Sequence, residues 1–152
     1  MKTFVIAICV LISTAGLLSG RMRPKSLQPQ KFDEFGDVTC EDELARLDSL
    51  ASELQKVQDS RTYIIVYGGQ HARRNEARAR AARMKFYLVR NRRLAGTQII
   101  TLDGGYRKSL TVELWVAQRG DPMPAPTPTL RPRDVILRGR VRVRGYYCGE
   151  GL

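Results

Sequence analysis

Arginine is the residue type of this sequence best suited to binding chemistry. The chain carries 26 Lys and Arg against 15 Asp and Glu, which gives a formal net charge of +11. Guanidinium groups pair with carboxylates and phosphates, so this balance favours anionic partners such as nucleic acid, acidic lipid or an anionic cell-wall polymer. The predicted contacts to such a partner are Arg73, Arg83, Arg138, Arg140, Arg142 and Arg144. The alternative interpretation is a solvated face for most of these side chains.

Residue types that support catalysis are scarce. His71 is the only histidine, and a general base or a zinc ligand would need partners that the sequence does not offer. No nucleophile–histidine set and no pair of carboxylates stands out, so we predict a protein that is not an enzyme and uses no metal or cofactor. Gly68 and Gly69 could present backbone N–H groups to an anion, although a tight turn is the simpler interpretation.

The central elements predicted from the sequence are a strand and a basic helix. Residues 63–67 form an apolar run rich in β-branched and aromatic residues, which is typical of a buried strand. In the helix that follows, a small apolar stripe is expected to face inward. Its members are Ala77, Ala81, Met84 and Leu88. Arg80 flanks this stripe at a half-buried position where an ordered partner is expected, whereas Arg83 is expected to point outward.

Further elements surround this pair. Thr39 is a predicted N-cap, and the acidic residues 41–43 suit the positive end of a helix that ends near residue 58. The expected inward residues of this helix are Leu44, Leu47, Ala51 and Leu54. Strands are predicted at residues 32–35, 97–102 and 111–117, and a turn at residues 103–106, Asp-Gly-Gly-Tyr. In the last strand Val112, Leu114 and Val116 share one face, and Glu113 and Trp115 share the other.

The two ends of the chain differ from the middle. Residues 1–20 have a short positive start, an apolar stretch over residues 4–12 and small residues near their end, which predicts a secretory signal peptide cleaved after Ala15 or Gly20. An uncleaved N-terminal anchor is the alternative. Residues 21–31 are polar and basic and predict a linker. The protein is therefore expected to be exported, to the periplasm or the cell envelope.

After the last predicted strand the composition changes again. Residues 120–133 carry five prolines and predict an extended, semi-rigid linker. Residues 134–152 alternate arginine with valine and predict either an edge strand or a basic tail that orders on a partner. Cys40 and Cys148 are a candidate disulfide pair in an oxidising compartment, with two unpaired thiols as the alternative.

Residues 32–119 resemble an OmpA-like domain, the peptidoglycan-associating module of bacterial envelopes. Phe-Asp-Glu-Phe at residues 32–35 looks like that family's opening, and Arg80-Ala81, Met84, Tyr87 and Leu88 match the spacing of its Arg-Ala-x-x-Val-x-x-Tyr-Leu helix. The resemblance implies an α+β fold of order β-α-β-α-β-β, a sandwich in which two helices cover a mixed sheet.

The resemblance also implies a ligand site. In that family an aspartate of a Gly-His-Thr-Asp turn and the helix arginine hold the diaminopimelate of the wall peptide. Arg80 takes the arginine's position, while Gly69, Gln70 and His71 stand where the family has His, Thr and Asp. Asp103 is the candidate acceptor for the ligand's ammonium group. The predicted ligand-binding residues are therefore Arg80, Gly69, His71 and Asp103.

Two functional hypotheses follow. The first is a non-catalytic cell-envelope binding module that associates with peptidoglycan or another anionic envelope component. The alternative is a scaffold that has lost the glycan site and binds a protein or a lipid through its basic helix and tail. Nucleic-acid binding fits the charge but conflicts with the predicted signal peptide and lacks a stacking aromatic platform, so it ranks third.

Overall fold

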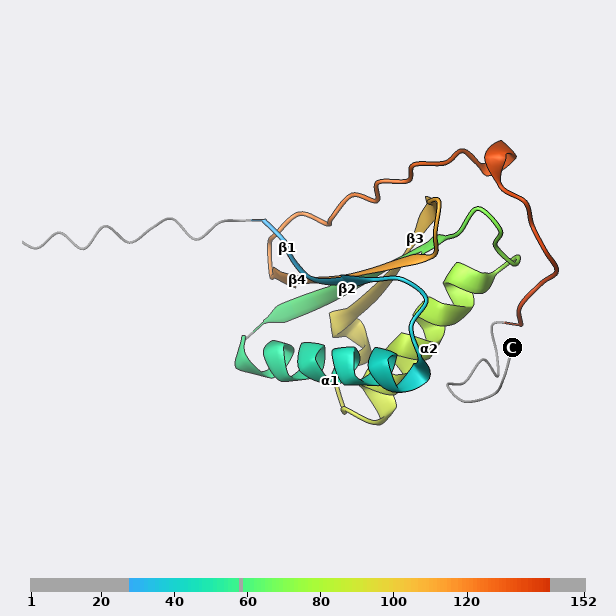
Figure 1. The fold of residues 1–152 in the computed structure, drawn as a ribbon. Helices are drawn as coiled ribbons and strands as arrows, with labels where there is room; N and C mark the ends of the chain where they lie inside the picture. Colours follow the sequence, from blue (N-terminus) through green and yellow to red (C-terminus); the bar gives the residue numbers. More distant parts are fainter. Residues whose placement is uncertain (1–27, 58, 143–152) are drawn as a thin grey trace, which may run out of the picture.

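The computed structural model describes residues 28–57 and 59–142, in which two helices pack on one face of a four-stranded mixed sheet (Figure 1). The elements are β1 (Gln30–Phe35), α1 (Cys40–Lys56), β2 (Ser60–Gly68), α2 (Glu76–Arg90), β3 (Ile99–Tyr106) and β4 (Thr111–Gln118). Two short 3-10 turns cover Gly96–Gln98 and Pro132–Asp134. The predicted α+β class and the predicted order of these strands and helices agree with the structure.

The sheet has the strand order β1-β4-β2-β3. β2 runs parallel to β3, and β4 runs antiparallel to both β1 and β2. Since β2 lies between β4 and β3 and is buried along nearly its whole length, its continuous apolar sequence follows from burial on both faces. In β4 the alternation is as expected: Val112 and Leu114 face the helices, and Glu113 lies on the other face.

Helix α1 begins where its sequence predicts. The Thr39 hydroxyl accepts a hydrogen bond from the Asp42 N–H at 3.3 Å, and acidic residues occupy the first turn. Its buried face is rotated slightly from the predicted one: Leu44 is only partly buried, whereas Leu50 and the carboxylate of Glu43 are buried. The helix ends at Lys56, two residues before the predicted end.

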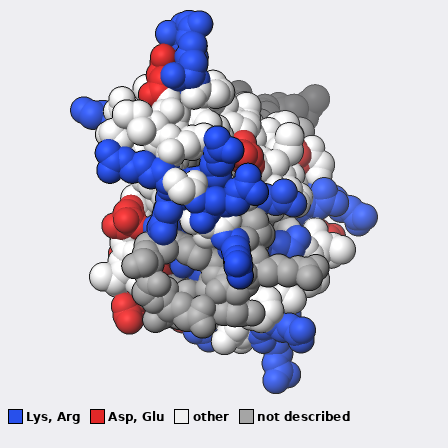
Figure 2. Space-filling view, turned by 90° about the vertical axis from the view of Figure 1, so that its right-hand side faces the viewer, with Lys and Arg blue, Asp and Glu red and all other residues white. Residues whose placement is uncertain are grey.

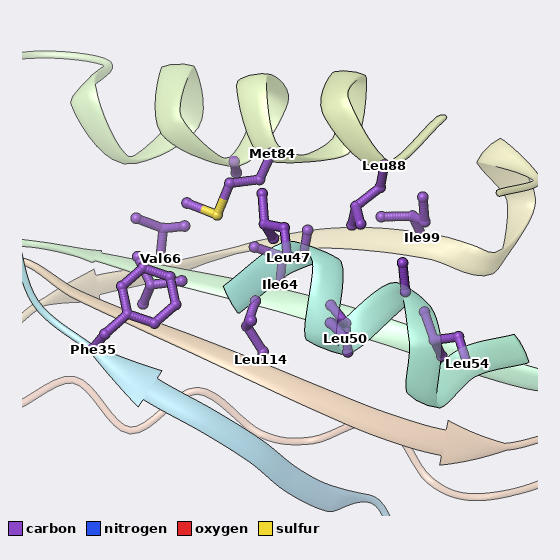
Figure 3. Packing of buried hydrophobic residues seen from close by; sticks show 13 residues of the cluster. Phe35, Leu47, Leu50, Leu54, Ile64, Val66, Met84, Leu88, Ile99 and Leu114 are labelled. Atoms are coloured by element: carbon purple, nitrogen blue, oxygen red, sulfur yellow. The ribbon is translucent and has the colours of Figure 1, made fainter. Parts of the chain in front are cut away.

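One apolar core joins both helices to the sheet (Figure 3). Leu47 and Leu50 from α1 meet Met84 and Leu88 from α2 above Ile64 of the central strand. The full cluster is Phe35, Leu47, Leu50, Ala51, Leu54, Ile64, Val66, Ala81, Met84, Leu88, Ile99, Val112 and Leu114. All of these side chains are at least 90% buried, so this core is what holds the helix layer on the sheet.

The third strand differs from its prediction at both ends. Thr97 and Gln98 belong to a 3-10 turn, and β3 continues through the Asp-Gly-Gly-Tyr motif that was expected to be a turn. Gly105 has a positive φ of 77°, and the pairing of β3 with β2 shifts register in the same region. A glycine that accommodates a bulge lets the strand continue where the sequence pattern suggested that it stops.

Residues 119–142, which we call the extended segment, are not a free linker and tail. Figure 1 shows them running along the sheet on the side away from the helices and then down past the loop that follows β2. Thr129 and Leu130 both donate a backbone hydrogen bond to the Tyr106 carbonyl at 3.0 Å. Residues 135–142 form no strand; the pairing there is an isolated parallel bridge between Arg74 and Arg140, so the choice between an edge strand and a basic tail stays open.

Several predictions lie outside the described residues. These are the signal peptide at 1–20, most of the linker at 21–31, Arg144, Cys148 and the tail beyond residue 142. β1 begins at Gln30, so the last residues of the predicted linker belong to the sheet. Cys40 is disulfide-bonded, and Cys148 is outside the described residues, so the pairing of these two cysteines stays a prediction. None of the described helices is long and apolar enough to span a membrane.

Candidate anion-binding surface

Arg80 is more deeply buried than expected. Its residue is only 3% exposed, and its Nη2 donates to Asp37 Oδ1 at 2.5 Å. Asp37 lies in the connection between β1 and α1, and its side chain is 70% exposed. The structure therefore gives Arg80 the ordered partner that was expected, and that partner is Asp37, which was not singled out from the sequence.

Arg83 does not point outward as predicted. Its Nε donates to Glu43 Oε1 at 3.0 Å, and its Nη2 pairs with the other oxygen of the same carboxylate. Glu43 is buried in α1, so this bidentate pair joins the two helices beneath the surface. In this structure Arg83 is an ion-pair partner of Glu43, and its predicted contact with an anionic partner stays a prediction.

The remaining predicted ligand residues do not gather around Arg80. Gly69 packs against the loop before β4, where a Cβ would lie 3.1 Å from the Leu110 nitrogen, and His71 is exposed. Asp103 Oδ1 accepts the Gly105 N–H at 2.9 Å. Asp103 also lines a depression of about 230 Å³ at the start of α2, whose lining does not include Arg80. The predicted four-residue ligand site is therefore not assembled.

A set of arginines does come together at the end of β2. Ile136 N–H donates to the Gln70 carbonyl at 2.8 Å, and Arg138 N–H donates to the Ala72 carbonyl at the same distance. Arg74 N–H in turn donates to the Gly139 carbonyl at 3.1 Å. These bonds hold the extended segment beside the loop that leads into α2.

We call the resulting group the arginine surface. Its members are Arg73, Arg74, Arg78, Arg138, Arg140 and Arg142. Figure 2 shows Lys and Arg side chains forming a band across this side of the molecule. Within the described residues, Arg73 pairs with Glu76 at 3.5 Å, whereas the other five form no ion pair and are exposed.

This surface contains four of the predicted contacts, Arg73, Arg138, Arg140 and Arg142, and adds two. Arg73 is only partly exposed. Arg74 and Arg78 were not singled out from the sequence, although Arg74 directly follows Arg73. The local sequence around an exposed arginine does not indicate which distant segment will lie beside it. Arg74 and Arg78 could therefore not be distinguished from solvated side chains by the sequence alone.

A buried carboxylate fastens the extended segment to the sheet. Glu113 Oε1 accepts from Arg107 Nη2 at 2.8 Å, and Glu113 Oε2 accepts from the Tyr67 hydroxyl at 3.1 Å. The same hydroxyl accepts the Thr127 N–H at 3.1 Å, and Arg107 Nη2 donates to Thr127 Oγ1 at 2.7 Å. Thr127 is thereby tied to the outer face of the sheet through two side chains that share Glu113.

The chemistry of this cluster keeps Glu113 ionised. Burial alone would raise the pKa of its carboxyl, but hydrogen bonds from Lys31, Arg107 and Trp115 outweigh burial and hold the pKa below its ordinary value. The guanidinium of Arg107 also lies 3.6 Å from the centre of the Tyr67 ring, a cation–π contact. The charged side chains of Arg107 and Glu113 therefore orient the Tyr67 ring, whose hydroxyl holds Thr127 of the extended segment.

Within the described residues, no group of three or more His, Cys, Asp or Glu side chains is placed to hold a metal ion. Comparison of the chain with protein-family models, with curated proteins and with solved structures finds no match. The interpretation of the arginine surface therefore depends on its own geometry and charge.

Proposed function

We propose that this protein is a non-catalytic binding module of the cell envelope, and that it holds an anionic envelope component on the arginine surface. The observation that carries this proposal is the convergence of five exposed arginines, none ion-paired within the described residues, from two segments that are 60 residues apart in the chain. A cluster of guanidinium groups at one place attracts and binds carboxylates and phosphates.

The organisation of the surface supports the same proposal. The extended segment is held in place by backbone hydrogen bonds and by the Glu113 cluster, so its arginines are presented by an ordered backbone. Preorganised groups lose less conformational entropy when they bind. The resemblance to OmpA-like domains and the predicted export place the expected partner in the envelope, and the α+β fold of two helices on a mixed sheet is consistent with that resemblance.

The test is co-sedimentation of the full chain with purified peptidoglycan sacculi and, separately, with purified envelope membranes. We expect binding to at least one of them, weakened by rising salt because exposed charges are screened beyond a Debye length of about 8 Å. The double variant Arg138→Ser/Arg140→Ser should lose at least about tenfold in affinity.

The matched control removes two arginines elsewhere. Arg61 and Arg119 are exposed and lie together at the opposite end of β2, roughly 26 Å away along a nine-residue strand. Arg61→Ser/Arg119→Ser changes the net charge equally and should retain most of the binding. Equal losses of affinity in both double variants would show that only net charge matters. No binding of the unaltered chain to either preparation would favour a protein partner. Either result overturns the proposal.

A second candidate function has its own observation. A zwitterionic amino-acid head, such as the diaminopimelate that the resemblance implies, needs an arginine for its carboxylate and an acceptor for its ammonium group. Asp37, which is largely exposed and lies against Arg80, supplies an acceptor at that position. On this hypothesis binding to sacculi survives high salt and is lost in Asp37→Asn, while Arg138→Ser/Arg140→Ser leaves it intact.

A further inference from the structure

Two apolar side chains are exposed in the middle of the basic part of the extended segment. Ile136 is 52% exposed and Leu137 is 41% exposed. Arg133 precedes them and Arg138 follows them directly. The same segment buries Val141 against the rest of the protein, so its backbone is close enough to the core to bury apolar side chains. Ile136 and Leu137 nevertheless remain in solvent.

These two residues are held by an ordered backbone. Ile136 N–H donates to the Gln70 carbonyl and Arg138 N–H donates to the Ala72 carbonyl, both at 2.8 Å. Ala72 itself is buried. The apolar pair is therefore presented from a defined position beside the arginine surface.

The combination of exposed arginines with an adjacent apolar pair favours one class of anionic partner over the others. The phosphates of a nucleic acid or the carboxylates of a wall polymer would use the arginines and leave the apolar pair in water. A bilayer with anionic headgroups uses both, because guanidinium groups bind lipid phosphates while apolar side chains enter the boundary between headgroups and acyl chains. Residues 131–142 contain one carboxylate, Asp134, and it is paired with Arg131 at 3.0 Å. Its charge therefore repels anionic headgroups only weakly.

We infer that the arginine surface, together with Ile136 and Leu137, is a peripheral docking surface for an anionic phospholipid bilayer. This inference rests on the proposed function and names its partner. The arginines contact the headgroup phosphates, and Ile136 and Leu137 enter the interface between them.

The experiment measures binding of the full chain to vesicles of phosphatidylcholine and to vesicles of equal parts phosphatidylcholine and phosphatidylglycerol. We expect binding to the mixed vesicles alone. Ile136→Ser/Leu137→Ser should weaken that binding by at least about tenfold, since two partly buried aliphatic side chains are lost from the interface. The same variant should bind soluble polyphosphate as tightly as the unaltered protein does.

The control is Met123→Ser, which removes a 58% exposed apolar side chain from the same segment but outside its arginine-rich part. It should bind mixed vesicles normally. The inference is overturned if the unaltered protein ignores mixed vesicles, or if Ile136→Ser/Leu137→Ser binds them as well as the unaltered protein does. If the protein does not bind vesicles but binds sacculi or envelope membranes, and Arg138→Ser/Arg140→Ser weakens that binding, the proposed function stands and this inference fails. Where no anionic preparation binds, both fail.

Discussion

At the scale of single residues, Glu113 is the most heavily engaged acid of the described chain. It is almost fully buried on the face of the sheet away from the helices, and it accepts hydrogen bonds from Lys31, Arg107, Tyr67 and Trp115. A buried carboxylate is tolerable only when its oxygens are satisfied in this way. The net effect of burial and these bonds is a pKa below 4.5, the ordinary value for this group.

The first stability prediction follows from that lowered pKa. A carboxyl whose pKa is lower in the folded than in the unfolded protein contributes stability above its unfolded pKa, and this contribution is lost as the pH falls through the folded pKa. Glu113→Gln should therefore lower the free energy of unfolding by about 3 kcal/mol near neutral pH. Denaturant unfolding across a pH series should show this difference shrinking in acid.

The matched control is Glu34→Gln. Glu34 also pairs with Lys31 and Arg107 but is exposed, so its loss should cost at most about 1 kcal/mol. A Glu113→Gln difference that stays constant into acid would contradict the assigned protonation state.

At the scale of elements, the extended segment depends on one aromatic ring of β2. The Tyr67 ring lies between Arg107, which stacks on it, and Gly104 of the neighbouring strand. A Cβ at Gly104 would lie 2.5 Å from Tyr67 Cδ1, closer than side-chain atoms can approach. The glycine is therefore needed for a close approach of ring and backbone, and Thr127 is held by the hydroxyl of that same ring.

We accordingly predict that Gly104→Ala displaces Tyr67 and loosens the extended segment. Overpacking of this kind should cost about 1–3 kcal/mol in denaturant unfolding, and the Thr127 amide hydrogen should exchange faster with solvent. Gly96→Ala is the control, since the nearest atom to its Cβ would be Val89 Cγ2 at 3.9 Å. Equal stability and equal amide exchange in the two variants would show that Tyr67 can move without consequence.

At the scale of the whole molecule, one core connects every strand to both helices. Leu47 of α1 is fully buried among residues of α2 and the sheet, as Figure 3 shows. Because the layers share these contacts, the described part of the chain is expected to unfold as one cooperative unit.

The prediction at this scale compares the same substitution in two places. Leu47→Ala should lower the free energy of unfolding by about 2–5 kcal/mol, because it leaves a cavity in the core. Leu137→Ala, in the arginine-rich part of the extended segment, should change it by no more than about 0.5 kcal/mol. Circular dichroism and tryptophan fluorescence should report one coincident transition in each protein; separate transitions would show that the helices and the sheet unfold independently.

Local features of this protein were determined by the sequence alone. The cap at Thr39, the apolar run of β2 and the alternation in β4 each depend on residues a few positions apart, and each is where its pattern predicts. The α+β class and the order of the strands and helices follow from the same local patterns.

The tertiary structure alone decided which charges are available to a partner. Arg83 and Glu43 lie 40 residues apart, and they pair only because the core sets α1 against α2. Arg80 finds Asp37 by the same packing. The arginine surface arises because the extended segment returns to the loop after β2. An arginine in a helical or alternating pattern has the same local sequence whether it is buried, paired or exposed, so only long-range packing distinguishes these outcomes.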